Sequence, residues 1–112
     1  MADSQVTHAC VVPSLFFTQG RRVAPSDVPH LRALIVGGEK LADDLVDVWG
    51  PASIPVLNAY RPPEATIGIS CPPVRVDSLA SDIGVAFAGN AFFVRAQNGD
   101  LAWRGEPGEL CI

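Results

Sequence analysis

The sequence predicts an α/β fold in which a parallel βαβ unit is followed by a β-rich segment. Apolar runs at residues 31–36 and 54–59 flank an amphipathic stretch, and parallel strands need such a crossover helix. Residues 76–112 carry turn signals instead of helical periodicity. A hydrophobic fraction of 48% with 18% charged residues indicates a folded chain. We expect an α/β part over residues 1–75 and a β-rich part over 76–112, together a single incomplete domain.

The first elements are a strand, a short helix and a loop. Residues 6–12 form an apolar, β-branched run that ends at a proline, which predicts a buried strand. Ser14 is placed to cap a short apolar helix that runs through Phe17. Residues 19–29 are polar and rich in turn formers, so we expect a loop there.

The βαβ unit follows this loop. A second buried strand is expected over residues 31–36, and Gly37-Gly38 ends it. Residues 39–49 are the clearest helix, because Leu41, Leu45 and Val48 fall on one face. Gly50-Pro51 stops it, since glycine tolerates a left-handed cap and proline cannot continue a helix. A third strand is expected over residues 54–59.

The remaining elements are extended. Residues 65–70 predict a fourth extended segment, and the change of character lies near residues 71–81. Residues 91–95 and 100–104 flank Gln97-Asn98-Gly99, where Asn-Gly predicts a hairpin with a type I′ turn. Residues 108–112 read as a last strand, which needs a partner because an open edge favours aggregation.

Composition excludes several classes of function. The net charge of −4 argues against nucleic-acid or anionic-membrane partners. No apolar run is long enough to cross a bilayer, and the first residues lack the features of a secretory signal. Three cysteines without metal-ligand spacing suit reduced thiols. We therefore expect a cytoplasmic protein.

Residues 58–66 carry the most informative motif, Asn-Ala-Tyr-Arg-Pro-Pro-Glu-Ala-Thr. It resembles the Asn-Ala-Tyr-Gly-Pro-Thr-Glu-Ala-Thr core motif of adenylate-forming, AMP-binding enzymes. Residues 6–15, 29–41, 82–84 and 105–112 resemble further segments of the same family in the same order. The chain is most similar to part of the amino-acid adenylation domain of fungal-type nonribosomal peptide synthetases. The resemblance implies a piece of the large N-terminal domain, followed by the start of its β-barrel subdomain.

The resemblance also implies an activity. The parent reaction is ATP-dependent activation of an amino acid to aminoacyl-AMP, followed by transfer to the phosphopantetheine thiol of a carrier-protein domain. The expected ligands are ATP or AMP, Mg²⁺ and the amino acid. Glu64 is the expected metal ligand, and no residue is assigned as catalytic. The residues expected to bind the nucleotide are Gly37, Gly38, Glu39, Asn58, Ala59 and Tyr60.

Each of these residues also has a structural interpretation. The two glycines either let a ligand approach the backbone or form a tight turn into the helix. Tyr60 either stacks on a purine or packs against protein. Asn58 either reads the adenine edge or forms a turn. Glu64 either supplies the hard oxygen that Mg²⁺ prefers or is simply solvated.

The amino-acid pocket of the family maps, by resemblance, onto small and apolar residues. Without a charge among them, the set suits a neutral side chain. The amino acid itself is not named by the sequence. The residues are Cys10, Ile35, Gly37, Ala59, Ile67 and Gly68.

Two motif positions depart from the family. Arg61 replaces a glycine that lets phosphate approach the backbone, although an arginine could itself supply positive charge. Pro63 replaces a threonine and removes its hydroxyl and N–H donors; losing one donor aimed at developing charge costs roughly 10²–10³ in rate. The phosphate loop and catalytic lysine of the family find no match, because Lys40 is the only lysine and fits neither. We expect little activity from this chain alone; the alternative is a nucleotide-binding or assembly module that complements another polypeptide.

Overall fold

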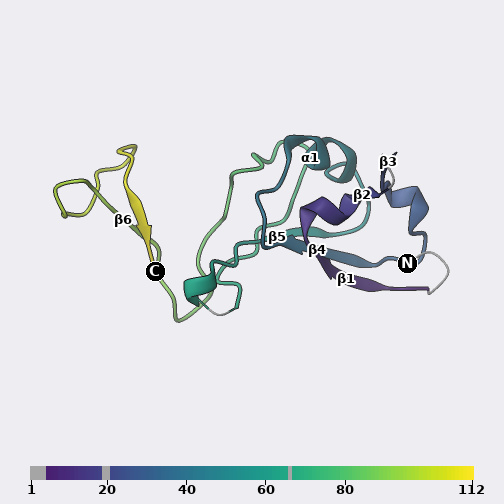
Figure 1. The fold of residues 1–112 in the computed structure, drawn as a ribbon, viewed down its shortest axis with the longest axis horizontal. Coiled ribbons are helices and arrows are strands. Elements are labelled where there is room, and N and C mark those ends of the chain that lie inside the picture. Colours follow the sequence, from purple (N-terminus) through teal and green to yellow (C-terminus); the bar gives the residue numbers. More distant parts are fainter. Residues whose placement is uncertain (1–4, 19–20, 66) are drawn as a thin grey trace.

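The computed structural model describes residues 5–18, 21–65 and 67–112. Its centre is a three-stranded parallel sheet in the order β1-β4-β5 (Figure 1). The strands are β1 (His8–Val11), β4 (Ala33–Gly37) and β5 (Val56–Ala59). Helix α1 (Asp43–Trp49) connects β4 to β5. The predicted α/β fold with a parallel βαβ unit is therefore confirmed.

Short elements fill the connections. The predicted helix at Ser14 is a 3₁₀ turn that starts one residue earlier. The loop predicted over residues 19–29 is wrong in part, because a strand and a 3₁₀ turn lie there. Residues 19 and 20 lie outside the described residues. These short elements are η1 (Pro13–Phe16), β2 (Phe17–Thr18), β3 (Arg21–Arg22), η2 (Pro25–Asp27) and η3 (Pro63–Ala65).

Helix α1 begins four residues later than predicted. Ala42, with φ −86° and ψ 142°, is still extended and is the residue that precedes the first helical turn. Leu41 is buried in the connection that precedes the helix, so it contributes to the core before the helix begins. The predicted apolar stripe is also shifted. The helix buries Leu45, Val46 and Trp49, whereas Val48 is only partly buried.

The helix ends at the predicted glycine, but for a different reason. Gly50 stays right-handed, with φ −58° and ψ −41°, so the predicted left-handed cap is wrong. A Cβ atom at this position would lie 2.9 Å from the carbonyl carbon and oxygen of Arg75. Glycine is required here because another segment passes close to its backbone.

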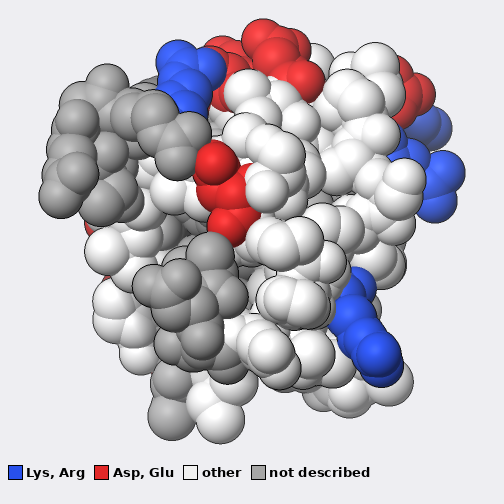
Figure 2. Space-filling model, turned by 90° about the vertical axis from the view of Figure 1, so that its right-hand side faces the viewer, with Lys and Arg blue, Asp and Glu red and all other residues white. Residues whose placement is uncertain are grey.

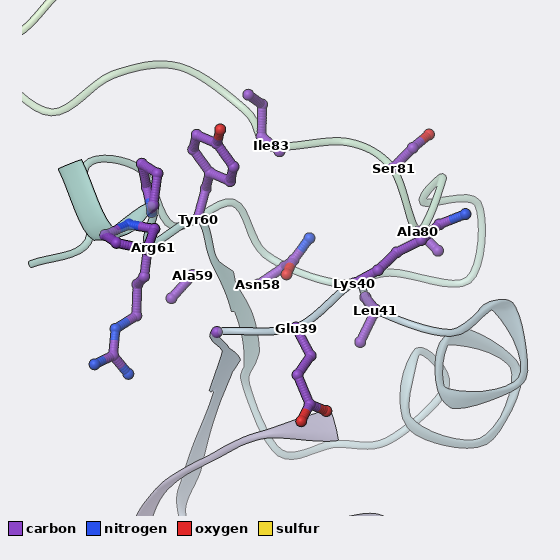
Figure 3. A pocket seen from close by; sticks show the side chains of 13 residues that line it. Glu39, Lys40, Leu41, Asn58, Ala59, Tyr60, Arg61, Ala80, Ser81 and Ile83 are labelled. Atoms are coloured by element: carbon purple, nitrogen blue, oxygen red, sulfur yellow. The ribbon is translucent and has the colours of Figure 1, made fainter. Parts of the chain in front are cut away.

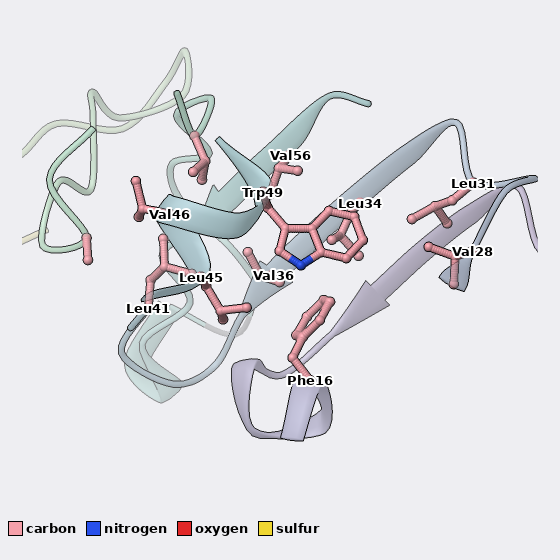
Figure 4. Packing of buried hydrophobic residues seen from close by; sticks show 12 residues of the cluster. Phe16, Val28, Leu31, Leu34, Val36, Leu41, Leu45, Val46, Trp49 and Val56 are labelled. Atoms are coloured by element: carbon pink, nitrogen blue, oxygen red, sulfur yellow. The ribbon is translucent and has the colours of Figure 1, made fainter. Parts of the chain in front are cut away.

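Trp49 is the centre of the hydrophobic core (Figure 4). It is 2% exposed, and its ring meets Phe16 edge to face with centroids 5.4 Å apart. The indole Nε1 donates a hydrogen bond of 3.2 Å to the carbonyl oxygen of Val23. The core therefore joins the first connections to the helix. Its members are Phe16, Val28, Leu31, Leu34, Val36, Leu41, Leu45, Val46, Trp49, Val56, Val74 and Ala80.

The two faces of the sheet differ in what covers them. Leu34, Val36 and Val56 point into the core beneath α1. Paired residues of neighbouring strands lie on the same face of a sheet. Cys10 pairs with Ile35 and Ile35 pairs with Leu57, so these three lie on the opposite face. Helix α1 packs on the side of Leu34, Val36 and Val56 and not on that side. We call it the outer face: Cys10, Ile35, Gly37, Leu57 and Ala59.

After β5 the chain turns back beside its own strand. The predicted extended segment at residues 65–70 is not a regular strand, since it makes only isolated antiparallel bridges such as Tyr60–Ser70. Residue 66 lies outside the described residues. A second bridge joins Leu57 to Pro73, and Val74 reaches the core. This return strip occupies the edge of β5 that another strand could otherwise use.

The last part of the chain is a hairpin of β6 (Phe93–Arg95) and β7 (Glu109–Cys111), paired antiparallel. The predicted last strand thus finds its partner. The predicted type I′ turn is wrong, because it needs positive φ at both Asn98 and Gly99. Only Gly99 is left-handed, at 92°, and its N–H bonds Ala96 O at 2.9 Å. This is the geometry of a type I turn followed by a glycine bulge.

The hairpin extends away from the α/β part (Figure 1). The molecule measures 53 × 25 × 24 Å along its principal axes. Large apolar side chains stay exposed after residue 75, and Trp103 is 85% exposed. The division of the chain at residue 75 into two parts of one domain stays a prediction. The exposed apolar residues of this part are Val76, Leu79, Val85, Phe87, Phe93, Leu101, Trp103 and Ile112.

Charges are spread thinly over the surface. In the end view of Figure 2, acidic side chains gather at the top, while the basic ones stand apart from one another. Uncharged residues, drawn in white, make up most of the surface between the charged side chains. This face offers no continuous basic patch among the described residues, consistent with the net charge of −4.

Candidate functional site

A pocket of about 520 Å³ opens where β4 and β5 end (Figure 3). The carboxyl ends of parallel strands are the usual ligand-binding edge of an open α/β sheet. The pocket has the volume of a small-molecule site. Its lining comes from the connection after β4, from the motif after β5 and from a later segment: Gly38, Glu39, Lys40, Leu41, Asn58, Ala59, Tyr60, Arg61, Pro62, Pro63, Ala80, Ser81 and Ile83.

The two glycines after β4 have different roles. A Cβ at Gly37 would lie 2.4 Å from Ala59 O, so this glycine allows β4 and β5 to approach each other. Gly37 does not line the pocket, whereas Gly38 does. Gly38 therefore remains the candidate for close approach of a ligand to the backbone, and Gly37 has a packing role.

Asn58 lines the pocket and also holds the segment of residues 80–83 in place. Its Nδ2 donates a hydrogen bond of 3.0 Å to Asp82 O. Among the described residues this is its one side-chain partner, which leaves Oδ1 and a second amide hydrogen for a ligand. The amide thus holds a distant segment, a role that neither sequence interpretation included, and it keeps the free donor and acceptor needed to read an adenine edge.

Tyr60 stands beside the pocket opening. Its backbone is fixed by N–H donation to Ser70 O at 3.1 Å and by acceptance from the N–H of Ile69 at 3.0 Å. Its ring meets Phe92 edge to face, with centroids 6.3 Å apart. In Figure 3 the ring and the side chain of Arg61 leave the chain in opposite directions. An edge contact leaves a ring face available for stacking on a planar ligand.

Residues 80–83 form a wall that sequence reasoning missed. Ser70, which is fully buried, donates through Oγ to Ile83 O at 2.5 Å. The Asp82 carboxylate accepts from Gly84 N–H at 2.7 Å and shapes the turn. Residues 82–84 resembled the family, but their contact with Asn58 spans 24 positions and has no signal in local spacing.

Glu39 has a partner away from the pocket interior. Its carboxylate accepts from Ser14 N–H at 2.9 Å and from Ser14 Oγ at 3.0 Å. Figure 3 shows the carboxylate directed toward the end of β1, away from Asn58. Glu39 thus caps the η1 turn, a role that the sequence assigned to Ser14 itself. Lys40, which the sequence matched to no site, also lines the pocket.

Glu64 is exposed in η3, next to the pocket-lining Pro63. It is not itself among the lining residues. Residues 5–18, 21–65 and 67–112 contain no group of three or more His, Cys, Asp or Glu side chains arranged to hold a metal. One carboxylate together with nucleotide phosphates is a common way to bind Mg²⁺, so the assignment of Glu64 stays a prediction that the geometry allows.

The outer face brings together four of the six residues assigned to the amino-acid pocket: Cys10, Ile35, Gly37 and Ala59. Of the other two, Ile67 is 73% exposed. Gly68 lies beside Arg61, where a Cβ would be 3.1 Å from Cγ.

Arg61 and Pro63 both line the pocket, but the guanidinium of Arg61 extends to the outer face. Pro63 begins η3 and lines the pocket. The Arg61 side chain instead passes Gly68 and brings NH1 to 3.8 Å from Cys10 Sγ. A charge therefore lies on a face that the sequence described as neutral.

The three cysteines are free thiols, as predicted. Burial raises the pKa of Cys71, and the nearby Cys10 raises it further. A raised pKa keeps the thiol neutral, which makes it less nucleophilic. Nothing in this arrangement forms a disulfide or a metal site.

A family model described as AMP-binding enzyme matches residues 1–112. The chain belongs to this family. It is 52% identical over 118 residues, covering 100% of this chain, to the ferrichrome siderophore peptide synthetase of Mycosarcoma maydis. It is 38% identical over 112 residues, covering 96%, to nonribosomal peptide synthetase 2 of Gibberella zeae. The chain spans 3% and 2% of the lengths of these two relatives.

Solved structures agree with this assignment. The adenylation domain AlmE of Vibrio cholerae, in complex with glycyl-adenosine-5′-phosphate, matches with a TM-score of 0.78 and 28% identity. The match covers 97% of this chain and 23% of that one. The adenylation and carrier protein PA1221 matches with a TM-score of 0.75 and 27% identity over 96% of this chain and 23% of that one. The predicted resemblance to a segment of a nonribosomal peptide synthetase adenylation domain is confirmed.

Helix α1 has seven residues. Among the helices that the structure describes, none has the length and apolar character needed to cross a bilayer.

Proposed function

We propose that this chain forms the adenine-facing wall and one side of the acyl site in an enzyme that activates an amino acid with ATP. The pocket at the carboxyl ends of β4 and β5 carries this proposal. It joins Gly38, Asn58 and Tyr60 at one opening, and the outer face lies on the other side of the same two strands. An aminoacyl-adenylate, the ligand named for the Vibrio cholerae relative, has a nucleotide end and an acyl end that suit these two surfaces.

Each residue has a defined task in this proposal. The Tyr60 ring stacks on the adenine, and the free amide atoms of Asn58 pair with its edge. Gly38 lets the base approach the backbone without a Cβ between them. Mg²⁺ neutralises phosphate charge when it is bound, and Glu64 would hold it.

The reaction itself is an in-line displacement. An amino-acid carboxylate oxygen bonds to the α-phosphorus of ATP, and the bond from that phosphorus to the pyrophosphate oxygen breaks. The aminoacyl group then passes from AMP to the thiol of a carrier-protein phosphopantetheine. Such a step depends on positioning and charge neutralisation. Pro63 offers neither an N–H nor a hydroxyl, so we propose that adenylation by this chain alone is weak or absent.

AMP binding to the purified 112-residue chain, measured by calorimetry, tests the nucleotide site. Tyr60→Ala should weaken binding about tenfold, since stacking of a base on an aromatic ring contributes about 1–3 kcal/mol. Tyr60→Phe should retain it, and Phe93→Ala in the hairpin is the matched control. Equal affinities for all four proteins would sink the assignment of the nucleotide to this pocket.

Pyrophosphate exchange tests the activity. In the full-length polypeptide that carries this segment, Arg61→Gly with Pro63→Thr should raise amino-acid-dependent exchange by about 10²-fold if the lost donors limit the reaction. No gain would show that the variant loop is competent. The 112-residue chain alone should show no exchange; measurable exchange would contradict the proposed inactivity.

A second candidate function is an assembly module, favoured by the exposed apolar residues that follow residue 75. Exposed apolar patches of this kind mark interaction surfaces. The chain would then complement another polypeptide that supplies the remaining parts of the domain. Light scattering of the chain alone and with such a polypeptide tests it; a monomer in both samples would exclude this function.

A further inference from the structure

The side chain of Arg61 introduces a charge onto the apolar outer face. NH1 lies 3.8 Å from Cys10 Sγ, and the aliphatic part of the side chain passes Gly68, where a Cβ would meet Cγ at 3.1 Å and Cδ at 3.8 Å. The strand residues of this face, among them Ile35 and Ala59, carry no charge. Arg61 is also among the residues that line the pocket, but the contacts of its guanidinium and aliphatic side chain are with Cys10 and Gly68.

The guanidinium has most of its bonding capacity left. Arginine has five N–H donors in a planar fork. Across residues 5–18, 21–65 and 67–112, its single polar partner is the Cys10 thiol, a weak acceptor. No carboxylate in that part of the chain pairs with it. Arg61 is exposed, so its remaining donors are open to a ligand, and the planar fork matches a carboxylate in two hydrogen bonds.

Resting on the proposed function, which puts the acyl substrate on the outer face, we propose that Arg61 is a specificity-determining residue that selects an amino acid with a carboxylate-bearing side chain. The side-chain carboxylate would pair with the free N–H donors of the Arg61 guanidinium, beside the Cys10 thiol. The reacting carboxylate would lie toward the nucleotide pocket, at the ends of β4 and β5. Cys10, Ile35 and Ala59 would then surround the methylene groups between the two carboxylates.

This replaces the neutral substrate expected from the sequence. The family-derived pocket positions are uncharged, but they omit residue 61. The structure supplies the missing charge from the motif loop, because the side chains of Tyr60 and Arg61 leave the backbone on opposite sides (Figure 3). The tyrosine ring lies at the pocket opening, and the guanidinium lies beside Cys10.

Cys10 provides a reporter inside the proposed site. The purified 112-residue chain is treated with iodoacetate or with neutral iodoacetamide, and alkylation of each cysteine is followed by mass spectrometry. Both reagents attack the same thiolate, so the ratio of their rates cancels its ionisation and reports the local preference for a carboxylate. Cys111, in the hairpin, is the internal control. The ratio at Cys10 should exceed that at Cys111 by about threefold, the size expected for an exposed charge pair.

Three variants and two competitors complete the test. Arg61→Gln should bring the ratio at Cys10 down to that at Cys111, and Arg61→Lys should retain the preference. Glutarate should protect Cys10 from iodoacetamide in the unsubstituted chain, should protect it less in Arg61→Lys and not in Arg61→Gln. Arg104→Gln, which removes an exposed arginine after β6, should change none of these ratios. A ratio at Cys10 equal to that at Cys111, or unchanged by Arg61→Gln, would overturn the proposal.

Pyrophosphate is the second competitor. Protection of Cys10 by pyrophosphate but not by glutarate would assign Arg61 to the phosphates of the nucleotide and would also overturn the proposal. AMP binding to the same chain distinguishes failure of the proposed nucleotide site from failure of the proposed carboxylate site at Arg61. If AMP fails to bind but the carboxylate preference persists, the nucleotide site is wrong and the anion site stands; AMP binding without the preference gives the reverse conclusion.

Discussion

The α/β region (residues 5–74) and the hairpin region (residues 85–112) use their apolar residues in different ways. Trp49 in the first is 2% exposed and Trp103 in the second is 85% exposed. All but one member of the core cluster come from the α/β region, and none comes from the hairpin region. Burial of apolar surface is the main favourable term in folding. The comparison indicates that the first region carries the stability and that the second depends on surfaces outside itself.

The two tryptophans give the largest expected contrast. Trp49→Ala should lower the free energy of unfolding by about 3–5 kcal/mol, because it opens a cavity against Phe16 and removes the hydrogen bond to Val23. Trp103→Ala should change it by less than about 0.5 kcal/mol. Urea titrations followed by far-ultraviolet circular dichroism measure both. Similar losses for the two variants would show that the hairpin region belongs to the same cooperative unit.

Two glycines that permit close approach of strands, one in each region, test the same difference between the α/β region and the hairpin region. A Cβ at Gly37 would lie 2.4 Å from Ala59 O, and one at Gly108 would lie 2.3 Å from Arg95 O. Either clash should cost about 1–3 kcal/mol locally. Gly37→Ala should accelerate amide exchange throughout β1, β4 and β5, whereas Gly108→Ala should accelerate it only in β6 and β7. Exchange that spreads from Gly108→Ala into the sheet would contradict this separation.

Residues 80–83, which form a wall of the pocket, connect the two regions. A substitution of Ser70 tests how much this segment contributes to stability. The Ser70 Oγ bonds Ile83 O in a fully buried position. Ser70→Ala should cost about 1–2 kcal/mol, because it leaves that carbonyl without its donor. It should also weaken AMP binding by freeing residues 80–83. Ser81→Ala, an exposed change in the same pocket wall, is the control and should leave the unfolding midpoint unchanged.

The smallest expected effect is a pH dependence from Cys71. Because its pKa in the folded chain is raised above the ordinary 9.0, the folded state holds the proton more tightly than the unfolded state. Stability is then fully present below pH 9 and falls as the pH rises toward the folded pKa. Cys71→Ala should remove this decline in thermal unfolding scans between pH 8 and pH 10, and Cys111→Ala should not. A decline that persists in Cys71→Ala would assign it to another group.

The sequence determined the local elements of the α/β region and its family. Apolar runs predicted β1, β4 and β5, and apolar residues at helical spacing predicted α1. An element that buries one face must carry apolar residues at its own structural period. Motif residues 58–66 predicted the position of the pocket at the end of β5. The predictions failed where a distant segment decides the local geometry, as at Gly50, where Arg75 passes close to the backbone.

The tertiary structure alone decided what each motif residue touches. The Asn58 amide holds Asp82 O, and the Glu39 carboxylate caps Ser14. The guanidinium of Arg61 lies beside Cys10, although the two are 51 positions apart. Such contacts depend on the order of strands in the sheet and on the side from which each side chain leaves the backbone. A linear pattern fixes the period of an element, but only the packed fold fixes which elements become neighbours.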